Sequence, residues 1–163
     1  MNVFVTVGMS EWPFDRLIRA SEPLCAEHEV FVQRGRSSVT PPCPSTDFLP
    51  YPEVLRRIAE ADVVVTHAGN TVRLVQRAGK VPIAIARTAG RREMPNDHQV
   101  EYLEAEQHTG RVVAVWDAAN LPEAVRAHPA VERTMLASRP LEPPVDPERV
   151  AALLDELWLT LAR

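Results

Sequence analysis

Five short runs of β-branched apolar residues constrain the fold of this chain more than any other feature. The runs are nearly continuous instead of alternating with polar residues, which fits strands that are covered on both faces, as in a parallel sheet. The predicted strands are residues 3–7, 30–32, 62–66, 83–86 and 112–115, with residues 47–49 as a weaker sixth.

Helical patterns separate these runs. Apolar residues recur at helical spacing over residues 14–24, and Pro23 is placed to end or kink that helix. Shorter helices are predicted around residues 54–58 and over 71–78. Two more begin at Asn96 and Asn120, each a candidate N-cap with Gln or Glu three residues later. The alternation predicts an α/β fold, a Rossmann-like and mainly parallel sheet with helices on both faces.

The end of the chain has a different pattern. Prolines at 140, 143, 144 and 147 predict an extended connector, and Asp146 is placed to cap a helix whose apolar stripe spans residues 150–161. That helix either packs on its own domain or meets a partner chain. We therefore divide the chain into a Rossmann-like domain over 1–138 and a connector with C-terminal helix over 139–163.

Composition excludes several classes of function. The chain has 163 residues, 6% aromatic residues and a formal net charge of −4, so we expect neither a broad grip on nucleic acid nor a base-stacking platform. No apolar run approaches the roughly 20 residues that span a bilayer, and the N-terminus lacks the pattern of a signal peptide. Cys25 and Cys43 match no metal or redox spacing, so a reducing, cytoplasmic setting is expected.

Two of the loops that follow predicted strands have small residues before a helix. Residues 8–13 follow the first strand, where Gly8 lets the backbone approach a ligand, although a tight turn with no ligand is an equal alternative. Residues 67–71 follow the third major strand, and free N–H groups at the next helix start suit a diphosphate. His67 either binds a phosphate or sugar or merely caps this turn.

The third loop, residues 87–99, is rich in arginine. Arg87, Arg91 and Arg92 either meet an anionic ligand or form a solvated loop. The residues after Asn96 fall in the first helical turn, near the place of a bound sugar. The five histidines show no metal-ligand spacing, so neither a metal nor a cofactor is expected.

The order of these motifs resembles the C-terminal-domain family of glycosyltransferase family 28. It is most similar to the single-domain members, such as the catalytic subunit of the two-chain enzyme that makes dolichol-linked chitobiose and subunits of bacterial exopolysaccharide glycosyltransferases. The resemblance covers residues 1–125 and rests on VFVTVG at 3–8, WPFDRLI at 12–18, DFLPY at 47–51, ADVVVTHAG at 61–69, AGKVP at 78–82 and NDHQVE at 96–101.

The resemblance implies the donor-binding half of a GT-B glycosyltransferase that takes a UDP-sugar. A separate, membrane-associated chain would supply the acceptor half and the catalytic base, recruiting this cytoplasmic chain to the inner face of the membrane, and the acceptor would be lipid-linked or a secondary metabolite. In isolation the chain would expose its partner surface, with self-association a consequence. The implied donor-binding residues are Gly8, Ser10, Gly35, Arg36, His67, Gly69, Asn70, Thr71, Arg87, Asp97, His98 and Gln99.

Three departures from that family fall at the implied donor site. Met9 stands where the family has a hydroxyl residue, and the loop after His67 is one residue shorter and lacks a second glycine. Leu74 aligns with a glutamate that would hold the ribose hydroxyls, a role that leucine cannot fill. The alternatives are thus a non-catalytic scaffold or regulatory subunit with a degenerate site, or a free-standing enzyme for another nucleotide.

Overall fold

The described part of the chain, residues 1–139 and 151–152 of a computed structural model, contains one six-stranded parallel sheet in the order β3-β2-β1-β4-β5-β6. The strands are β1 (Asn2–Thr6), β2 (Glu29–Gln33), β3 (Ser45–Thr46), β4 (Val63–His67), β5 (Ile83–Ile85) and β6 (Val113–Ala114). Central strand β1 pairs with β2 and β4, and Val3 aligns with Val30 on one side and with Val63 on the other. The predicted α/β class and parallel sheet are confirmed.

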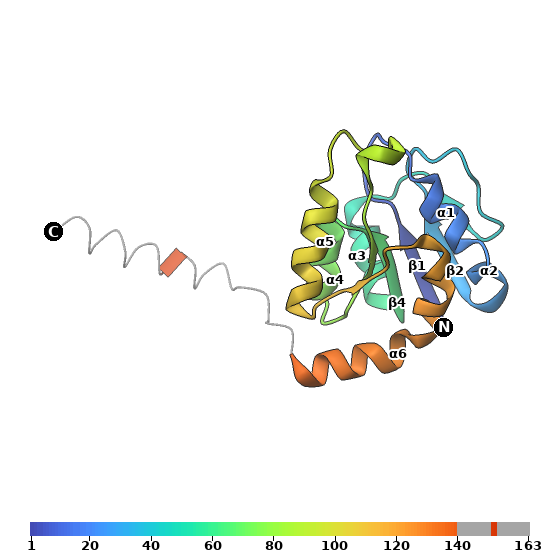
Figure 1. Ribbon diagram of the computed structural model, residues 1–163. Coiled ribbons are helices and arrows are strands. Elements are labelled where there is room, and N and C mark those ends of the chain that lie inside the picture. Colours follow the sequence, from blue (N-terminus) through green and yellow to red (C-terminus); the bar gives the residue numbers. More distant parts are fainter. Residues whose placement is uncertain (140–150, 153–163) are drawn as a thin grey trace.

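Helices cover both faces of this sheet (Figure 1). They are α1 (Asp15–Ser21), α2 (Leu24–Glu27), α3 (Tyr51–Glu60), α4 (Asn70–Arg77), α5 (His98–Thr109) and α6 (Leu121–Ser138), with 3₁₀ turns η1 (Ala89–Arg91) and η2 (Ala118–Asn120). On one face, residues of α1, α2 and α6 pack against strand valines. On the other face, Phe4 and Val64 contact α3 and α4, and Ala84 contacts α5.

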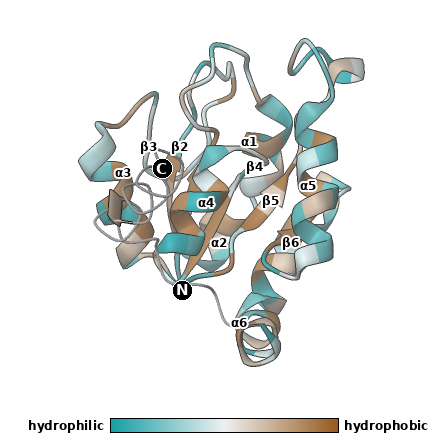
Figure 2. Ribbon diagram, turned by 90° about the vertical axis from the view of Figure 1, so that its left-hand side faces the viewer, coloured by the Kyte–Doolittle hydropathy of each residue, from teal (hydrophilic) through white to brown (hydrophobic). Residues whose placement is uncertain are grey.

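Burial on both faces explains why the strands read as continuous apolar runs. Val3, Phe4 and Val5 are consecutive in β1 and are all at most 1% exposed. The ribbon coloured by hydropathy accordingly shows hydrophobic strands inside and hydrophilic residues on the outer sides of the helices (Figure 2). The loops that follow the strands gather at one edge, at the top of Figure 1, away from the N-terminus.

The predicted positions of two elements, the sixth strand and the start of α5, are wrong. The sixth strand is Ser45–Thr46 and lies just before the predicted residues 47–49, because it pairs with the end of β2 through only two residues. Helix α5 begins at His98 with Asp97 as its N-cap, so Asn96 does not cap it. The Asn96 side chain instead pairs with the Nδ1 atom of His98.

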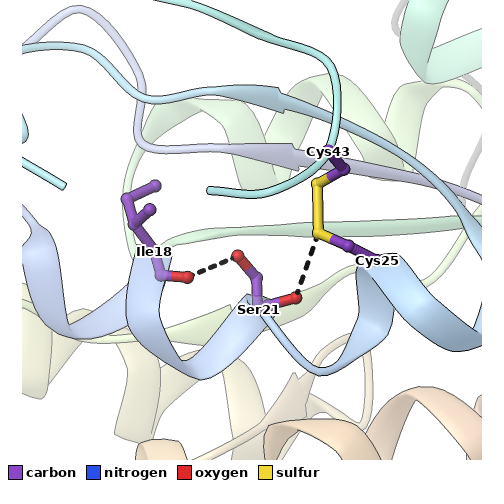
Figure 3. The surroundings of a disulfide bond; sticks show 4 residues. All are labelled: Ile18, Ser21, Cys25 and Cys43. Carbon is purple, nitrogen blue, oxygen red and sulfur yellow. Dashed lines mark hydrogen bonds between the residues drawn. A yellow bond between two sulfur atoms is a disulfide. The ribbon is translucent and has the colours of Figure 1, made fainter. Parts of the chain in front are cut away.

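The expectation that both cysteines are reduced is also wrong. Cys25 and Cys43 form a disulfide across a sequence separation of 18, with their Cα atoms 5.4 Å apart. Figure 3 shows this bond beside Ser21, whose carbonyl group lies near the Sγ atom of Cys25. The bond forms because α2 holds Cys25 beside the segment that enters β3, a proximity that the spacing of the two cysteines does not reveal.

The predicted connector and C-terminal helix lie outside the described residues, apart from Arg139 and the helical residues 151–152. Among the helices that the structure describes, none combines the length and the apolar composition of a membrane-spanning segment. The same part of the chain holds no group of His, Cys, Asp and Glu side chains arranged to bind a metal ion.

Candidate functional site

A cavity of about 280 Å³ opens at the carboxyl ends of β1, β2 and β4. In a doubly wound sheet the order of strands reverses between β1 and β4, and ligands bind in the crevice outside the strand ends at that point. The cavity is lined by Thr6, Gly8, Met9, Gln33, Leu49, Tyr51, Val54, His67, Asn70, Thr71 and Leu74. Of the residues implied by the resemblance, the structure brings Gly8, His67, Asn70 and Thr71 together here.

The imidazole of His67 is held between two glycines. A Cβ atom on Gly8 would lie 2.4 Å from its Cε1 atom, and one on Gly69 would lie 2.4 Å from its Nε2 atom. Both distances are shorter than any real contact, and Gly8 also has a φ of 75° that favours glycine. These glycines therefore make room for a side chain of the protein itself at the edge of the cavity.

Burial lowers the pKa of His67 to about 4, and the positive charge of Arg87 adds to this effect. The imidazole is therefore neutral at neutral pH, with its Nδ1 atom 3.3 Å from the hydroxyl of Thr66. A neutral ring offers a hydrogen bond to a ligand but no charge. His67 thus lines the cavity without making it a cationic phosphate site.

The polar wall of the cavity comes from the ends of β1 and β2. The hydroxyl of Thr6 donates to the Oε1 atom of Gln33 over 2.8 Å, and both residues are buried. Among the described residues, the acceptor near the Nε2 atom of Gln33 is the sulfur of Met9, at 3.8 Å. Sulfur is a weak acceptor, so this amide keeps a donor for a ligand in the cavity.

The opposite wall is apolar. Leu49 comes from the loop between β3 and α3, Tyr51 and Val54 come from the start of α3, and Leu74 comes from α4. Thr71 and Leu74 are three residues apart in α4 and so share the face turned to the cavity. Among the described residues that line the cavity, none carries a carboxylate or a permanent positive charge.

A second cavity of about 300 Å³ adjoins the first, and Asn70 lines both. Its other lining residues are Ala68, Gly69, Arg73, His98 and Tyr102. Gly69 is the N-cap of α4 and offers no side chain to the free N–H groups of the first turn. Arg73 brings to this cavity a guanidinium group that the first cavity lacks, and Gly69 and Asn70 from the start of α4 line it too, so the cavity suits an anion.

Arg73 is held in place by neighbouring groups. One of its nitrogens lies 2.7 Å from the carboxylate of Glu106, which is itself buried, and its guanidinium lies 5.8 Å from the centre of the Tyr102 ring. The Tyr102 hydroxyl is buried without a hydrogen-bond partner, and burial raises its pKa. A ligand oxygen in this cavity would satisfy that hydroxyl.

Arg87 is buried and contacts the protein itself. Its guanidinium donates to the carbonyl groups of Val7, Trp12 and Pro13 at 2.7–3.0 Å and lies 4.6 Å from the centre of the Phe14 ring. Burial lowers its pKa to about 10, so it remains charged at neutral pH. The side chain is 0% exposed and holds the loop after β1, so its charge faces protein carbonyls instead of an open site.

The second cavity includes the predicted Gly69 and His98, and the remaining predicted residues line neither cavity. Gln99 accepts a hydrogen bond from the backbone of Arg87, and Asp97 accepts one from Ala89, so both tie the loop after β5 to the start of α5. Ser10 accepts from the backbone of Trp12. Gly35 and Arg36 line neither cavity, and Arg36 instead lies over the ring of Phe48.

Sequence reasoning did not nominate several lining residues. Gln33 is the last residue of β2, and its place at a strand end is the signal that would have indicated it. Arg73 lies one turn into α4, three residues after Asn70, so helical spacing would have placed it on the same side. Tyr102 carried no such signal, because its position depends on how α5 packs against α4.

Known proteins share the fold of this chain, but its sequence matches no known family. The chain matches no protein-family model, and no curated protein matches its sequence. Among solved structures, the calicheamicin glycosyltransferase CalG4 superposes with a TM-score of 0.62 at 18% identity, over 99% of this chain and 44% of that one.

Two further structures are similar to the same degree. The glycosyltransferase SnogD from Streptomyces nogalater has a TM-score of 0.60 at 18% identity, over 96% of this chain and 43% of that one. The glycosyltransferase of kitacinnamycin has a TM-score of 0.59 at 19% identity, over 85% and 38%. The chain therefore has the fold of one Rossmann-like half of a GT-B glycosyltransferase and spans less than half the length of each of these proteins.

Proposed function

We propose that this chain is the donor-binding half of a glycosyltransferase and that it binds a nucleotide-sugar at the carboxyl edge of its sheet. The observation that carries the proposal is the pair of neighbouring cavities at that edge, which share Asn70 as a lining residue. The first is uncharged and suits a nucleoside, and the second is lined by Arg73 and by residues at the start of α4, which suits a diphosphate.

The chemistry proposed for this half is stabilisation of the leaving group. As the glycosidic bond breaks, negative charge develops on the departing nucleoside diphosphate, and helix N–H groups with a guanidinium stabilise it. A base that deprotonates the acceptor is assigned to the second half of the enzyme. We propose that this half is a partner chain, associated with the membrane, which recruits this subunit and binds a lipid-linked or secondary-metabolite acceptor. No cofactor is included in the proposal.

Calorimetry with a panel of nucleoside diphosphates tests the binding proposal. We expect micromolar dissociation constants, and we expect Arg73→Met to weaken binding of a diphosphate about tenfold more than binding of the parent nucleoside. Arg77→Met, at the opposite end of α4, is the matched control and leaves both affinities unchanged. Binding of no nucleotide by the unmodified chain would sink the proposal.

Co-expression tests the two-chain proposal. The chain is purified with the product of the neighbouring gene, and sugar transfer is assayed from several nucleotide-sugars. Transfer by the complex, with none by either chain alone, is the expected result. Transfer by the isolated chain would instead identify a free-standing enzyme.

A non-catalytic subunit is the second candidate function. It is favoured by Met9 and Leu74, which both line the first cavity where the similar family has polar side chains. This candidate predicts that the partner chain binds while no nucleotide does. A measurable nucleotide affinity of the unmodified chain contradicts it.

A further inference from the structure

We infer that the arginine-rich loop after β5, residues 86–97, forms a separate binding site for a small aromatic carboxylate. Residues of this loop line a third cavity of about 250 Å³, together with residues that follow β6. This cavity lies at the same edge of the sheet as the two cavities described above, but it shares no lining residue with either of them. The inference is therefore independent of the proposed nucleotide site.

Much of the lining of this third cavity is apolar. It comes from the ends of β5 and β6 and from the start of α5, as Ala86, Val100, Val115 and Trp116. The indole N–H of Trp116 donates to the Oε1 atom of Gln107 over 3.0 Å, so the carbon surface of the ring is what remains for a ligand. A cavity of roughly 150 Å³ is enough for a benzene ring. The third cavity therefore has room for one ring that carries a carboxylate.

The rest of the lining is polar and positively charged. Arg16 and Arg91 both line the cavity, and none of its described lining residues carries a carboxylate. Arg91 is exposed, and it has no acidic partner in the part of the chain that the structure describes. Thr88 adds a hydroxyl group to the same lining. A negatively charged group in this cavity would therefore meet cations and no repelling carboxylate.

The charge of Arg16 is only partly compensated. Its Nε and Nη2 atoms each lie 2.9 Å from an oxygen of the Glu93 carboxylate, whereas its Nη1 atom donates to none of the described residues. Buried Arg87 depends on the same residue, because its Nη1 atom donates to the carbonyl of Glu93 over 3.4 Å. Burial lowers the pKa of Arg87, and the charge of Glu93 partly offsets that effect. Two guanidinium groups thus share one carboxylate, which leaves excess positive charge beside the cavity.

Internal contacts hold the loop in shape. The backbone of Arg92 has a φ of 57°, in the left-handed region that favours glycine. The next residue, Glu93, is 7% exposed, and its carboxylate accepts from the backbone N–H of Thr88 over 3.1 Å. Strained backbone of this kind persists where its surroundings fix it, and it is concentrated at binding sites. A ligand would therefore meet Arg91 in a loop that is already ordered, which reduces the entropy lost on binding.

The combination of charge and apolar surface indicates the class of ligand. A carboxylate can accept two N–H groups from one guanidinium, and such charged hydrogen bonds are stronger than neutral ones. An aromatic ring fills the apolar space beside Trp116. An anion without a ring lacks the apolar contacts, and a ring without charge lacks the ionic hydrogen bonds, so each should bind more weakly than the aromatic carboxylate.

An NMR titration with benzoate, benzamide and acetate tests this inference. Benzamide has the shape of benzoate without its charge, and acetate has the charge without the ring. We expect benzoate to shift the indole N–H signal of Trp116 with a dissociation constant on the order of 1 mM. Benzamide should bind roughly tenfold more weakly, and acetate should leave the signal unchanged. Trp116→Phe identifies the signal, because it removes that indole.

Arg91→Met should weaken the binding of benzoate roughly tenfold and leave the binding of benzamide unchanged. Arg92→Met is the matched control, because Arg92 is the neighbouring exposed arginine and does not line the cavity. It removes the same charge and should keep the affinity for benzoate. Equal affinities for benzoate and benzamide, an equal loss in the two variants, or no shift with benzoate overturns the inference. Since no nucleotide is present, these outcomes leave the proposed function standing.

Discussion

At the scale of single residues, a glycine directly after a strand can have two different reasons, and the loops after β1 and β4 show both. Glycine after a strand indicates a close approach of backbone and ligand, and that interpretation predicted a site at Gly8 and Gly69. In the structure these glycines also accommodate the ring of His67, which lies 2.4 Å from the Cβ position of each. The glycines therefore shape the cavity by fixing its histidine.

Replacement of Gly69 by alanine tests this packing. The added Cβ atom would overlap the Nε2 atom of His67, so the ring must move, and we expect the free energy of unfolding to fall by about 1–3 kcal/mol. Urea unfolding measures the change. Gly90→Ala, which meets nothing within 4 Å, is the control and stays within about 0.5 kcal/mol. If Gly69→Ala is no worse in the unmodified chain than in a His67→Ala background, the packing argument is wrong.

The low pKa of His67 predicts a pH dependence of stability. The unfolded chain takes up a proton near pH 6.5, whereas folded His67 does so only near pH 4. Stability from this group is therefore complete above pH 6.5 and is lost as the pH falls from 6.5 to 4, by at most about 3 kcal/mol.

Urea unfolding between pH 4 and pH 7 measures this loss. His67→Gln should reduce the fall in unfolding free energy over that range, because glutamine binds no proton in either the folded or the unfolded state. Exposed His108 is the matched control, and His108→Gln should keep the slope of the unmodified chain. Equal slopes for the unmodified chain and His67→Gln would contradict the lowered pKa of His67.

At the scale of elements, the ends of helices depend on groups that are distant in sequence. Lys80, the only lysine of the chain, donates from its Nζ atom to the carbonyl groups of Ile58, Ala59 and Ala61 at 2.6–2.9 Å. These carbonyls belong to the last turn and the C-cap of α3, where helix geometry leaves carbonyls without intrahelical donors and a positive charge is favourable. Lys80, in the loop after α4, thus stabilises the end of α3.

Removal of that ammonium group should loosen α3. We expect Lys80→Met to lower the unfolding free energy by about 1–3 kcal/mol, because three carbonyls lose a charged donor. Hydrogen exchange should locate the loss of protection in the last turn of α3. Arg77→Met removes an exposed positive charge at the end of α4, and its effect should stay within about 0.5 kcal/mol. Unchanged exchange in α3 of Lys80→Met would refute this role.

At the scale of the whole molecule, the disulfide joins α2 to the segment that enters β3. Strand β3 has only two paired residues, and the residues after it, Leu49 and Tyr51, form the apolar wall of the first cavity. The Cys25–Cys43 bond closes a loop over a separation of 18 residues, a length for which a cross-link contributes roughly 3 kcal/mol by restricting the unfolded chain.

Reduction should therefore lower the thermal midpoint. We expect a lower Tm in dithiothreitol than without it, while the Cys25→Ser, Cys43→Ser double variant should have the same Tm in both conditions. Alkylation under denaturing conditions without reductant should label neither cysteine. Labelling of both cysteines in protein purified without reductant would show that they are free thiols and would contradict the disulfide.

The sequence by itself determined the class of fold, because continuous β-branched runs and helical periodicity are local properties of the chain. It also placed the loops after β1 and β4 at one edge, because parallel strands end together. Tertiary structure alone decided the rest: where β3 and α5 begin, the burial of Arg87, the disulfide, and the meeting of Gln33, Leu49 and Leu74 in one cavity. These depend on contacts between residues far apart in the sequence, whose energies no local pattern contains.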